Sequence, residues 1–365
     1  MIRLLSSCLV ALLVGLLMTR VAKTLALRFG VVDKPDARRV HKGVVPRMGG
    51  LGIYCGFMAG ALVYTLSHPN LTLAGEPLGL LLAATIVFIT GLVDDVRSIR
   101  PTTKLAGQLL AALVFVGFGG YIKFLSNPFG GDIIYVDYWG IPVTLLWLVG
   151  ISNAVNLIDG LDGLAGGVSI ISACTLAVAS LSHGYNLAAA LLFVLAAATL
   201  GFLRYNFSPA SIFMGDSGSL TLGFVLGAIS IMGFAKGATI VALIIPILIL
   251  AIPIMDTFFA IIRRLIEHKP IMQPDKGHLH HRLLAKGLSH KQTVLIIYAI
   301  TMFMGCIAIL MPLLSPLVRL LVVLGAFVLV LLCAKALGIL GVKTEIDTPE
   351  TAEKAAEEKN NGQAE

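Results

Sequence analysis

Long apolar runs of about 17–25 residues recur along the chain, and short segments that carry most of the charges separate them. Runs of this length are typical of transmembrane α-helices, whereas the strands of a membrane barrel alternate apolar and polar residues over about ten positions. Only 13% of the residues are charged, against roughly 25% in a soluble domain. The sequence therefore predicts an all-α, polytopic integral membrane protein.

Eleven such runs predict eleven transmembrane helices. They cover residues 4–27, 48–66, 78–93, 104–121, 141–158, 164–182, 186–203, 218–235, 238–262, 293–312 and 317–339. Lysine and arginine gather in alternate connections, most densely after the first, third and ninth runs. By the positive-inside rule, these connections and the C-terminus lie in the cytoplasm and the N-terminus lies outside.

Composition also bounds the domains and the partners. Residues 1–340 are expected to form one integral membrane domain, and the Glu-, Lys- and Ala-rich residues 341–365 a disordered cytoplasmic tail. The net charge of +7 does not indicate nucleic-acid binding, because the basic residues are spread over several connections without an accompanying aromatic surface. The five cysteines lie in apolar runs without CxxC spacing, so neither a disulfide framework nor a zinc site is expected.

The segment from Asn153 to Gly167 places two amides and two carboxylates at the end of an apolar run, followed by glycines. Asn153, Asn156, Asp159 and Asp162 are three residues apart, so on a helix any three consecutive members would spread over about 120° of the surface. Polar groups at a membrane edge are costly and mark functional sites. A glycine-rich helix contact bridged by an amide is the structural alternative, but it does not account for two carboxylates.

Two further acidic motifs lie at the ends of predicted spans. Asp94 and Asp95 are adjacent, and their repulsion requires a nearby cation or protonation of one of them. Asp216 precedes the eighth span, and with an oxygen from Asn156 or Asp159 it would suit Mg²⁺, which keeps waters and substrate phosphates as ligands. The structural alternatives are a solvated helix end for the acidic pair and an N-cap for Asp216.

The ninth connection carries three histidines, His278, His280 and His281, between Lys276 and Arg282. No cysteine accompanies them, so a zinc site is less favoured than a basic pocket for a phosphate-bearing ligand. A surface patch for anionic lipids is the simpler alternative.

Carboxylates for a divalent cation and basic groups for phosphate oxygens thus gather on one predicted face at the membrane boundary. Phosphoryl transfer requires both, because the metal ion and the cations neutralise the phosphate oxygens. The location implies that one substrate is a membrane lipid and that the other is cytoplasmic.

Four motifs in this order resemble those of the polyprenyl-phosphate N-acetylhexosamine-1-phosphate transferases, also called glycosyltransferase family 4. They are Asp94-Asp95 with Lys104, the Asn153 to Gly166 segment, Phe213 to Ser219, and His278 to Arg282. The resemblance extends to about residue 340. The His-Leu-His-His-Arg spelling and the eleven predicted spans look closer to the undecaprenyl-phosphate N-acetylglucosaminyl-1-phosphate transferases than to the phospho-MurNAc-pentapeptide translocases, which are the alternative branch.

This resemblance implies that GlcNAc-1-phosphate passes from UDP-GlcNAc to undecaprenyl phosphate, giving undecaprenyl-diphospho-GlcNAc and UMP. The reaction would take place on the cytoplasmic face of the plasma membrane, as the first membrane step of a cell-envelope polysaccharide such as wall teichoic acid or O-antigen. It implies Mg²⁺ as the cofactor, with Mn²⁺ as a substitute, and it leaves a homodimer open.

The resemblance also implies three sets of site residues, matched by position. The metal ligands would be Asp216 and Asn156. The catalytic set would be Asp94, Asp95, Asp159, Asp162 and His281, with Asp94 as the base or phosphate-positioning residue. The substrate-binding set would be Lys42, Lys104, Asn153, Asp159, Phe213, His278, His280 and Arg282, with Phe213 near the uracil.

Two other classes place acids in a membrane protein. An ion-coupled transporter would carry them in the middle of its spans, whereas here nearly all lie at the predicted cytoplasmic ends. An intramembrane aspartyl protease requires Gly-x-Gly-Asp, but Phe213 stands two residues before Gly215. Asp256 is the one acid well inside an apolar run, and the sequence leaves its role open.

Overall fold

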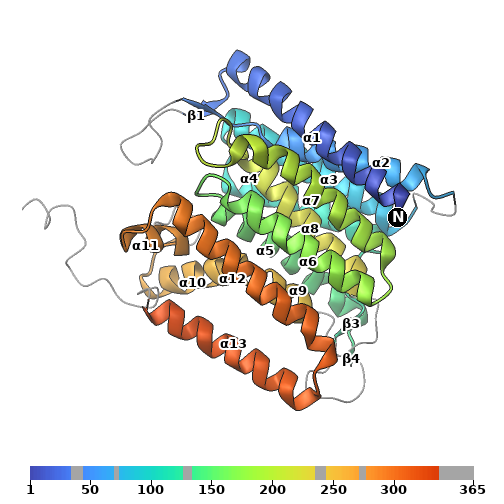
Figure 1. Cartoon of the computed structure of the whole chain (residues 1–365), viewed down its shortest axis with the longest axis vertical. Coiled ribbons are helices and arrows are strands. Elements are labelled where there is room, and N and C mark those ends of the chain that lie inside the picture. The colour runs from blue at the N-terminus through green and yellow to red at the C-terminus, as the bar shows by residue number, and fades with distance from the viewer. Residues whose placement is uncertain (34–43, 70–73, 126–133, 235–243, 271–276, 337–365) are drawn as a thin grey trace, which may run out of the picture.

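The computed structural model describes residues 1–33, 44–69, 74–125, 134–234, 244–270 and 277–336. Most of these residues are helical, so the prediction of an all-α membrane protein is confirmed. The long helices lie side by side in one bundle, with the N-terminus at one end and β1 and α11 at the other (Figure 1). Lys42 and the predicted tail lie outside the described residues.

Among the described residues, every predicted span overlaps at least one helix. The helices are α1 (Ile2–Phe29), α2 (Gly50–Leu66), α3 (Glu76–Arg97), α4 (Pro101–Gly117), α5 (Gly140–Ile158), α6 (Leu164–Ser182), α7 (Asn186–Asn206), α8 (Gly215–Phe234), α9 (Ile244–Ile249), α10 (Ala251–Ile266), α11 (Leu279–Ala285), α12 (His290–Leu310) and α13 (Pro316–Ala336), with short 3₁₀ turns η1 (Asp137–Trp139) and η2 (Met311–Leu313). Among the described residues, seven helices are long and apolar enough to cross a membrane, and three more are shorter apolar helices. The count of eleven spans and their orientation stay predictions.

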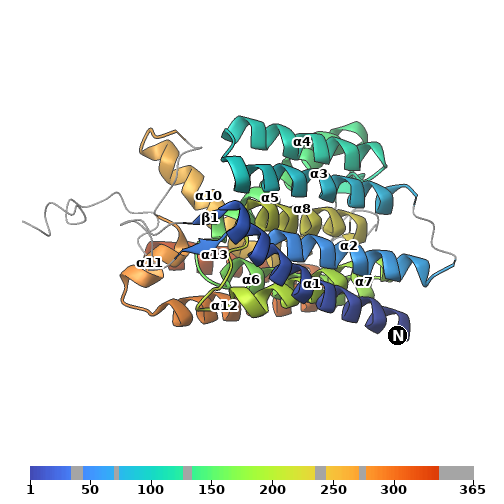
Figure 2. The ribbon, with the colours of Figure 1, turned by 90° about the horizontal axis from the view of Figure 1, so that it is seen from above.

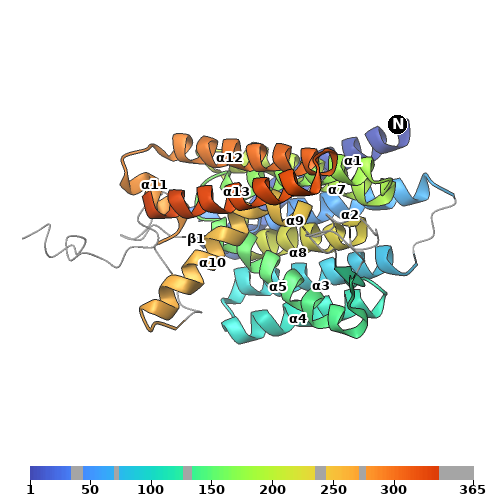
Figure 3. The ribbon, with the colours of Figure 1, turned by 90° about the horizontal axis from the view of Figure 1, so that it is seen from below.

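The ninth predicted span, residues 238–262, begins outside the described residues, and its described part falls on two helices, α9 and α10. They meet at Leu250, whose backbone leaves the helical region. Pro253 has no N–H to bond to the carbonyl of Ile249, and its ring crowds that carbonyl, so the helix cannot continue straight through this point. After the break α10 runs obliquely to the bundle (Figures 2 and 3), and Asp256 on α10 lies against the start of α11.

α8 is the most deeply enclosed span, with 94% of its apolar window buried, so it forms the centre of the bundle. It packs against α3 and α5. Gly91 of α3 permits this approach, because a Cβ there would lie 2.5 Å from the backbone of Asp216 and Ser217. The first turn of α8 is therefore held close to the end of α3.

Two short antiparallel strand pairs lie outside the bundle. β1 (Val32–Asp33) pairs with β2 (Val45–Pro46), and β3 (Phe124–Leu125) pairs with β4 (Ile134–Tyr135). Arg47, directly after β2, forms a parallel bridge with Phe213. This bridge joins the first connection of the chain to the segment just before α8.

Small residues let α1, α2 and α7 approach closely. Gly52, Gly56 and Gly60 recur along α2. A Cβ on Gly56 would lie 2.7 Å from the carbonyl oxygen of Ala11 in α1 and 2.9 Å from Cβ of Ala198 in α7. Helices in lipid associate through this kind of close packing, because burial of apolar surface gives them little advantage there.

We expect Gly56→Leu to lower the unfolding temperature of the purified protein in detergent, because the new side chain must push α1 and α7 apart at a cost of about 1–3 kcal/mol or more. Gly150→Leu is the matched control, since Gly150 lies mid-helix in α5 with no atom within 4 Å of its added Cβ. Thermal melts of both variants test this, and equal melting temperatures would contradict the packing role of Gly56.

Candidate active site

The N-terminus of α8 is capped by a carboxylate from another helix. Asp95 of α3 accepts hydrogen bonds from the backbone N–H of Asp216 at 2.8 Å and of Ser217 at 3.0 Å, and from the Ser217 hydroxyl at 2.6 Å. Its side chain is fully buried, and the guanidinium of Arg47 lies 3.5 Å from Oδ1. A negative charge is stabilised here because the first N–H groups of a helix lack partners and the helix dipole is positive at this end. Asp95 therefore determines where Asp216 lies.

Asp216 lies where three helices meet. Its Oδ2 pairs with the ammonium of Lys104 on α4, and its Oδ1 accepts a hydrogen bond from Asn156 Nδ2 on α5 at 3.1 Å. The same ammonium lies 3.1 Å from Asp94 Oδ2, so Lys104 bridges two carboxylates from different helices. We call Asp94, Lys104, Asn156 and Asp216 the carboxylate cluster.

The two adjacent acids of α3 point to different partners. Asp95 turns inward to α8, whereas Asp94 faces Lys104 and accepts a bond from the backbone N–H of Ile99 at 3.0 Å. Each carboxylate thus has its own cation, Arg47 for Asp95 and Lys104 for Asp94. The repulsion expected from the sequence is relieved in this way.

Asp159 ends α5 beside this cluster. Burial, followed by repulsion from Asp216 and then Asp95, raises the pKa of its carboxyl group to about 7. Its side chain is half-buried. A carboxyl group that exchanges its proton near neutral pH is suited to proton transfer, and it lies within electrostatic reach of the carboxylate cluster.

Asp162 and Asn206 hold the segment that leads into α8. Asp162 accepts a hydrogen bond from the backbone N–H of Ala210 at 2.9 Å. Asn206 accepts from the N–H of Gly163 and donates to the carbonyl of Ile212, both at 3.0 Å. These bonds tie the α5–α6 turn to the α7–α8 connection.

The backbone of Phe213 is fixed from the opposite side. Its N–H donates to the carbonyl of Pro46 at 2.8 Å, and its carbonyl accepts from the N–H of Gly49 at 2.9 Å. The Phe213 side chain is half-buried. The first and seventh connections thus meet at the N-terminus of α8.

Asn153, predicted to bind substrate, has another partner. Its amide nitrogen donates to Gln108 Oε1 of α4 at 2.7 Å and to the carbonyl of Val149 at 2.8 Å. Gln108 is fully buried. The pair therefore joins α4 to α5 one turn before Asn156, and Asn153 supports the cluster through the packing of these two helices.

The histidine segment is anchored by Asp256. Its Oδ2 lies 2.9 Å from His278 Nδ1, and its Oδ1 accepts the backbone N–H of Leu279 at 2.8 Å. Asp256 and His278 are 7% and 5% exposed, so this is a buried pair at the first turn of α11. Asp256, whose role the sequence left open, joins α10 to α11.

His280 connects this segment to the rest of the site. Its ring lies against Gly160, in the turn that follows Asp159. Burial, followed by the neighbouring charge on His281, lowers the pKa of His280 to about 3, so its imidazole is neutral at pH 7. Its buried Nε2 has no hydrogen-bond partner among the described residues.

The last two predicted residues of the segment, His281 and Arg282, are half-buried. The ring of His281 lies 4.2 Å from that of His280, and Arg282 Nε donates to the carbonyl of Gly277 at 3.1 Å. The structure thus brings connections one, three, five, seven and nine together. The sequence alone assigns no site role to Arg47, Gln108 or Asn206, although the position of Arg47 directly before an apolar run could have indicated it.

The donors of the carboxylate cluster fit Mg²⁺ better than zinc. Among the described residues, no group of three or more His, Cys, Asp or Glu side chains could hold a metal ion alone. The cluster instead offers oxygens of Asp94 and Asp216, which already share one cation, and the amide of Asn156. Mg²⁺ takes one or two protein carboxylates and completes its shell with waters and substrate phosphates.

Comparison with known proteins identifies the class of this site. Residues 77–234, which include the whole carboxylate cluster, match the family described as Glycosyl transferase family 4. The chain is 45% identical over 303 residues to the probable undecaprenyl-phosphate N-acetylglucosaminyl 1-phosphate transferase of Bacillus subtilis (strain 168), covering 82% of each chain. It is 41% identical over 312 residues to the decaprenyl-phosphate N-acetylglucosaminephosphotransferase of Mycolicibacterium smegmatis, covering 78% of this chain and 76% of the relative.

A more distant relative is the undecaprenyl-phosphate alpha-N-acetylglucosaminyl 1-phosphate transferase of Escherichia coli (strain K12), which is 30% identical over 297 residues. That match covers 79% of this chain and 78% of the relative. Fold, site and relatives together define a membrane-bound transferase. The chain belongs to glycosyl transferase family 4.

We expect Asp95→Asn to destabilise the protein by about 2–3 kcal/mol, because an amide can accept from only one side and leaves a buried donor of α8 facing its own NH₂ group. Chemical denaturation followed by helix signal measures this. Asp137→Asn, at an exposed carboxylate of η1, is the control, and a loss no larger than that of the control would contradict the capping role.

We expect Asp256→Asn to loosen α11 without unfolding the bundle, because the amide cannot supply the charge that holds His278. Hydrogen exchange should accelerate about 10–150-fold at residues 278–286, as expected when a charge-assisted bond of about 1.5–3 kcal/mol is lost. Glu267→Gln, whose side chain pairs with Lys269 near the end of α10, should leave that exchange unchanged. Unaltered protection in the Asp256 variant would contradict the anchoring role.

Proposed function

We propose that this protein transfers GlcNAc-1-phosphate from UDP-GlcNAc to undecaprenyl phosphate, releasing UMP. The observation that carries the proposal is the carboxylate cluster, in which Lys104 bridges Asp94 and Asp216 at the end of the central helix. The relatives' names support the sugar phosphate and a polyprenyl phosphate acceptor. Phosphoryl transfer depends mainly on positioning and on neutralising phosphate oxygens, which this arrangement can provide.

In this proposal Asp216 and Asn156, assisted by Asp94, hold Mg²⁺, which when bound neutralises the diphosphate of the sugar nucleotide. Lys104 stands between the two carboxylates and contributes a second positive charge for phosphate oxygens. Asp95 acts as a positioning residue, because its carboxylate is used entirely in capping α8. Its role is therefore to hold Asp216 in register.

Asp94 and Asp159 are the proposed residues for the acceptor phosphate. The attacking atom is already a phosphate oxygen, so only the last proton, with a pKa of about 6, has to leave. We assign Asp94 to positioning or deprotonating the acceptor phosphate, since its Oδ2 contacts the ammonium of Lys104 within the carboxylate cluster. The pKa of about 7 of Asp159 lets it hold a proton beside the nucleotide near neutral pH, and a bound divalent cation would lower that pKa.

The histidine segment would bind the nucleotide part of the sugar-nucleotide donor. We propose that His281 and Arg282, with Lys42, neutralise phosphates, and that His278 and neutral His280 shape the pocket wall beside Gly160. Phe213 and Asp162 are proposed to lie near the base. The backbone of Phe213 and the carboxylate of Asp162 make the hydrogen bonds that hold the adjoining connection. Arginine is suited to phosphate because its planar fork binds two oxygens.

We infer that the site faces the cytoplasm of the plasma membrane and serves the first membrane step of a cell-envelope polysaccharide. Arg47, Lys104 and Arg282 belong to the connections that are richest in basic residues, and the positive-inside rule favours the cytoplasmic side for them. UDP-sugars are cytoplasmic substrates in this proposal. The proposed acceptor lipid would approach from the bilayer beside α4.

Transfer of phospho-MurNAc-pentapeptide from its UDP donor to undecaprenyl phosphate is the second candidate from the same chemistry. The test uses the purified full chain with Mg²⁺ and undecaprenyl phosphate. UMP should appear with UDP-GlcNAc and remain at background with UDP-MurNAc-pentapeptide, and chelation of the metal should stop the release. UMP from the pentapeptide substrate alone would overturn the sugar assignment, and release from neither would overturn the proposal.

We expect Asp216→Asn to lower UMP release at least about 100-fold, since changing even an outer-shell partner of a metal costs about 10–100-fold. Its melting temperature should stay within a few degrees of the parent, because the main-chain caps of α8 are retained. Asp137→Asn serves again as a control with full activity. Parent-like turnover of Asp216→Asn would remove it as a metal ligand.

A further inference from the structure

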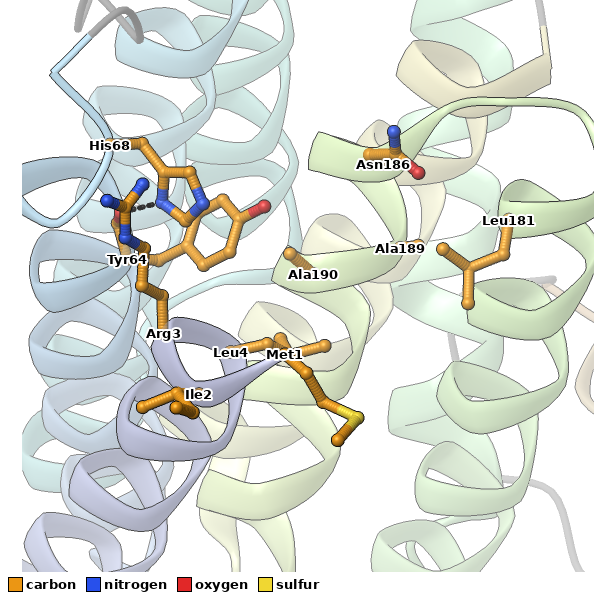
Figure 4. A pocket seen from close by; sticks show the side chains of 10 residues that line it. All are labelled: Met1, Ile2, Arg3, Leu4, Tyr64, His68, Leu181, Asn186, Ala189 and Ala190. Atoms are coloured by element: carbon orange, nitrogen blue, oxygen red, sulfur yellow. Dashed lines mark hydrogen bonds between the residues drawn. The ribbon is translucent and has the colours of Figure 1, made fainter.

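A cavity of about 640 Å³ lies at the end of the bundle opposite the carboxylate cluster. The first turn of α1, the end of α2, the end of α6 and the start of α7 surround it (Figure 4). Figure 1 shows this end at the N-terminus, away from β1 and α11. The catalytic proposal uses none of its residues.

Two polar groups in the cavity have no partner among the described residues. Tyr64 is 7% exposed, yet no hydrogen bond of the described chain engages its hydroxyl, which points from α2 toward α7 (Figure 4). Arg3 is exposed, and no described carboxylate pairs with its guanidinium. The hydroxyl and the guanidinium are both open to the cavity and can donate hydrogen bonds to the oxygens of a ligand.

The Tyr64 ring is held in place by His68. The two rings lie 4.2 Å apart, and His68 Nδ1 donates to the carbonyl of Tyr64 at 2.8 Å. The hydroxyl therefore keeps one direction. The hydroxyl of Tyr64 and the guanidinium of Arg3 both line the cavity, and donors of these two kinds can bind an anion.

The remaining lining favours an amphiphile over a free anion. No acidic residue lines the cavity, and most of its other members are apolar: Met1, Ile2, Leu4, Leu181, Ala189 and Ala190. Below it, Leu5, Leu9 and Leu13 of α1 are 54–59% exposed and recur every fourth residue, as on a face that contacts acyl chains. Four apolar helices end at the cavity, so it lies at the depth of lipid headgroups.

We propose that this cavity binds the phosphate of an anionic phospholipid. Arg3 and the Tyr64 hydroxyl donate to the phosphate oxygens, and the acyl chains run along the apolar face of α1. This site is independent of the transfer reaction.

The test titrates the purified full chain in detergent with phosphatidylglycerol and with phosphatidylcholine of the same acyl chains, and native mass spectrometry counts the bound lipid. Phosphatidylglycerol should bind about tenfold more tightly. Arg3→Gln should weaken its binding about tenfold and Tyr64→Phe about threefold, whereas Arg3→Lys should retain most of it. Arg20→Gln, which removes an exposed arginine of α1 far from the cavity, is the matched control.

UMP release by the variants should stay within about twofold of the parent, which shows that they are folded. Equal binding of the two lipids, or an equal effect of Arg20→Gln and Arg3→Gln, would overturn the proposal. Glycerol phosphate without acyl chains serves as the competitor, and displacement of the lipid at equal concentration would reassign the cavity to a soluble phosphate.

Discussion

The cap that Asp95 places on α8 determines the geometry of the whole site. A carboxylate without access to water is costly, but here it accepts from the first N–H groups of α8, which have no partner within the helix. The buried carboxylate and the unpaired N–H groups thus satisfy each other. The contact also fixes how α8 is placed along α3. Asp216 is the first acid of that helix, so its place in the membrane follows from this bond.

Around this contact, each acidic side chain lies next to a basic side chain from another part of the chain. Lys104 of α4 lies between acids of α3 and α8, and Arg47 approaches the cap from the first connection. Three connections therefore contribute these charges, and the packing of the bundle holds the helices that carry them. Partly buried ion pairs of this kind add little net stability, so we attribute them to function.

The all-helical class and the gathering of acids at span ends could be predicted, because apolar run length and polar residues at a membrane edge are local properties. Which acid faces which partner could not. Asp94 and Asp95 are adjacent, yet one lies beside Lys104 and the other caps α8, and this depends on the rotation of α3 against two distant helices. Asn153 and Asn156 differ in the same way, since the first pairs with Gln108. The break at Leu250 was missed because α9 and α10 form one apolar run.

His280 rests directly on the main chain at Gly160. Because Gly160 has no side chain, the His280 ring can approach the turn after Asp159 this closely. A side chain at position 160 would push the His280 ring, and the start of α11 with it, away from this turn. The spacing between the histidine segment and the end of α5 therefore depends on a residue that has no side chain.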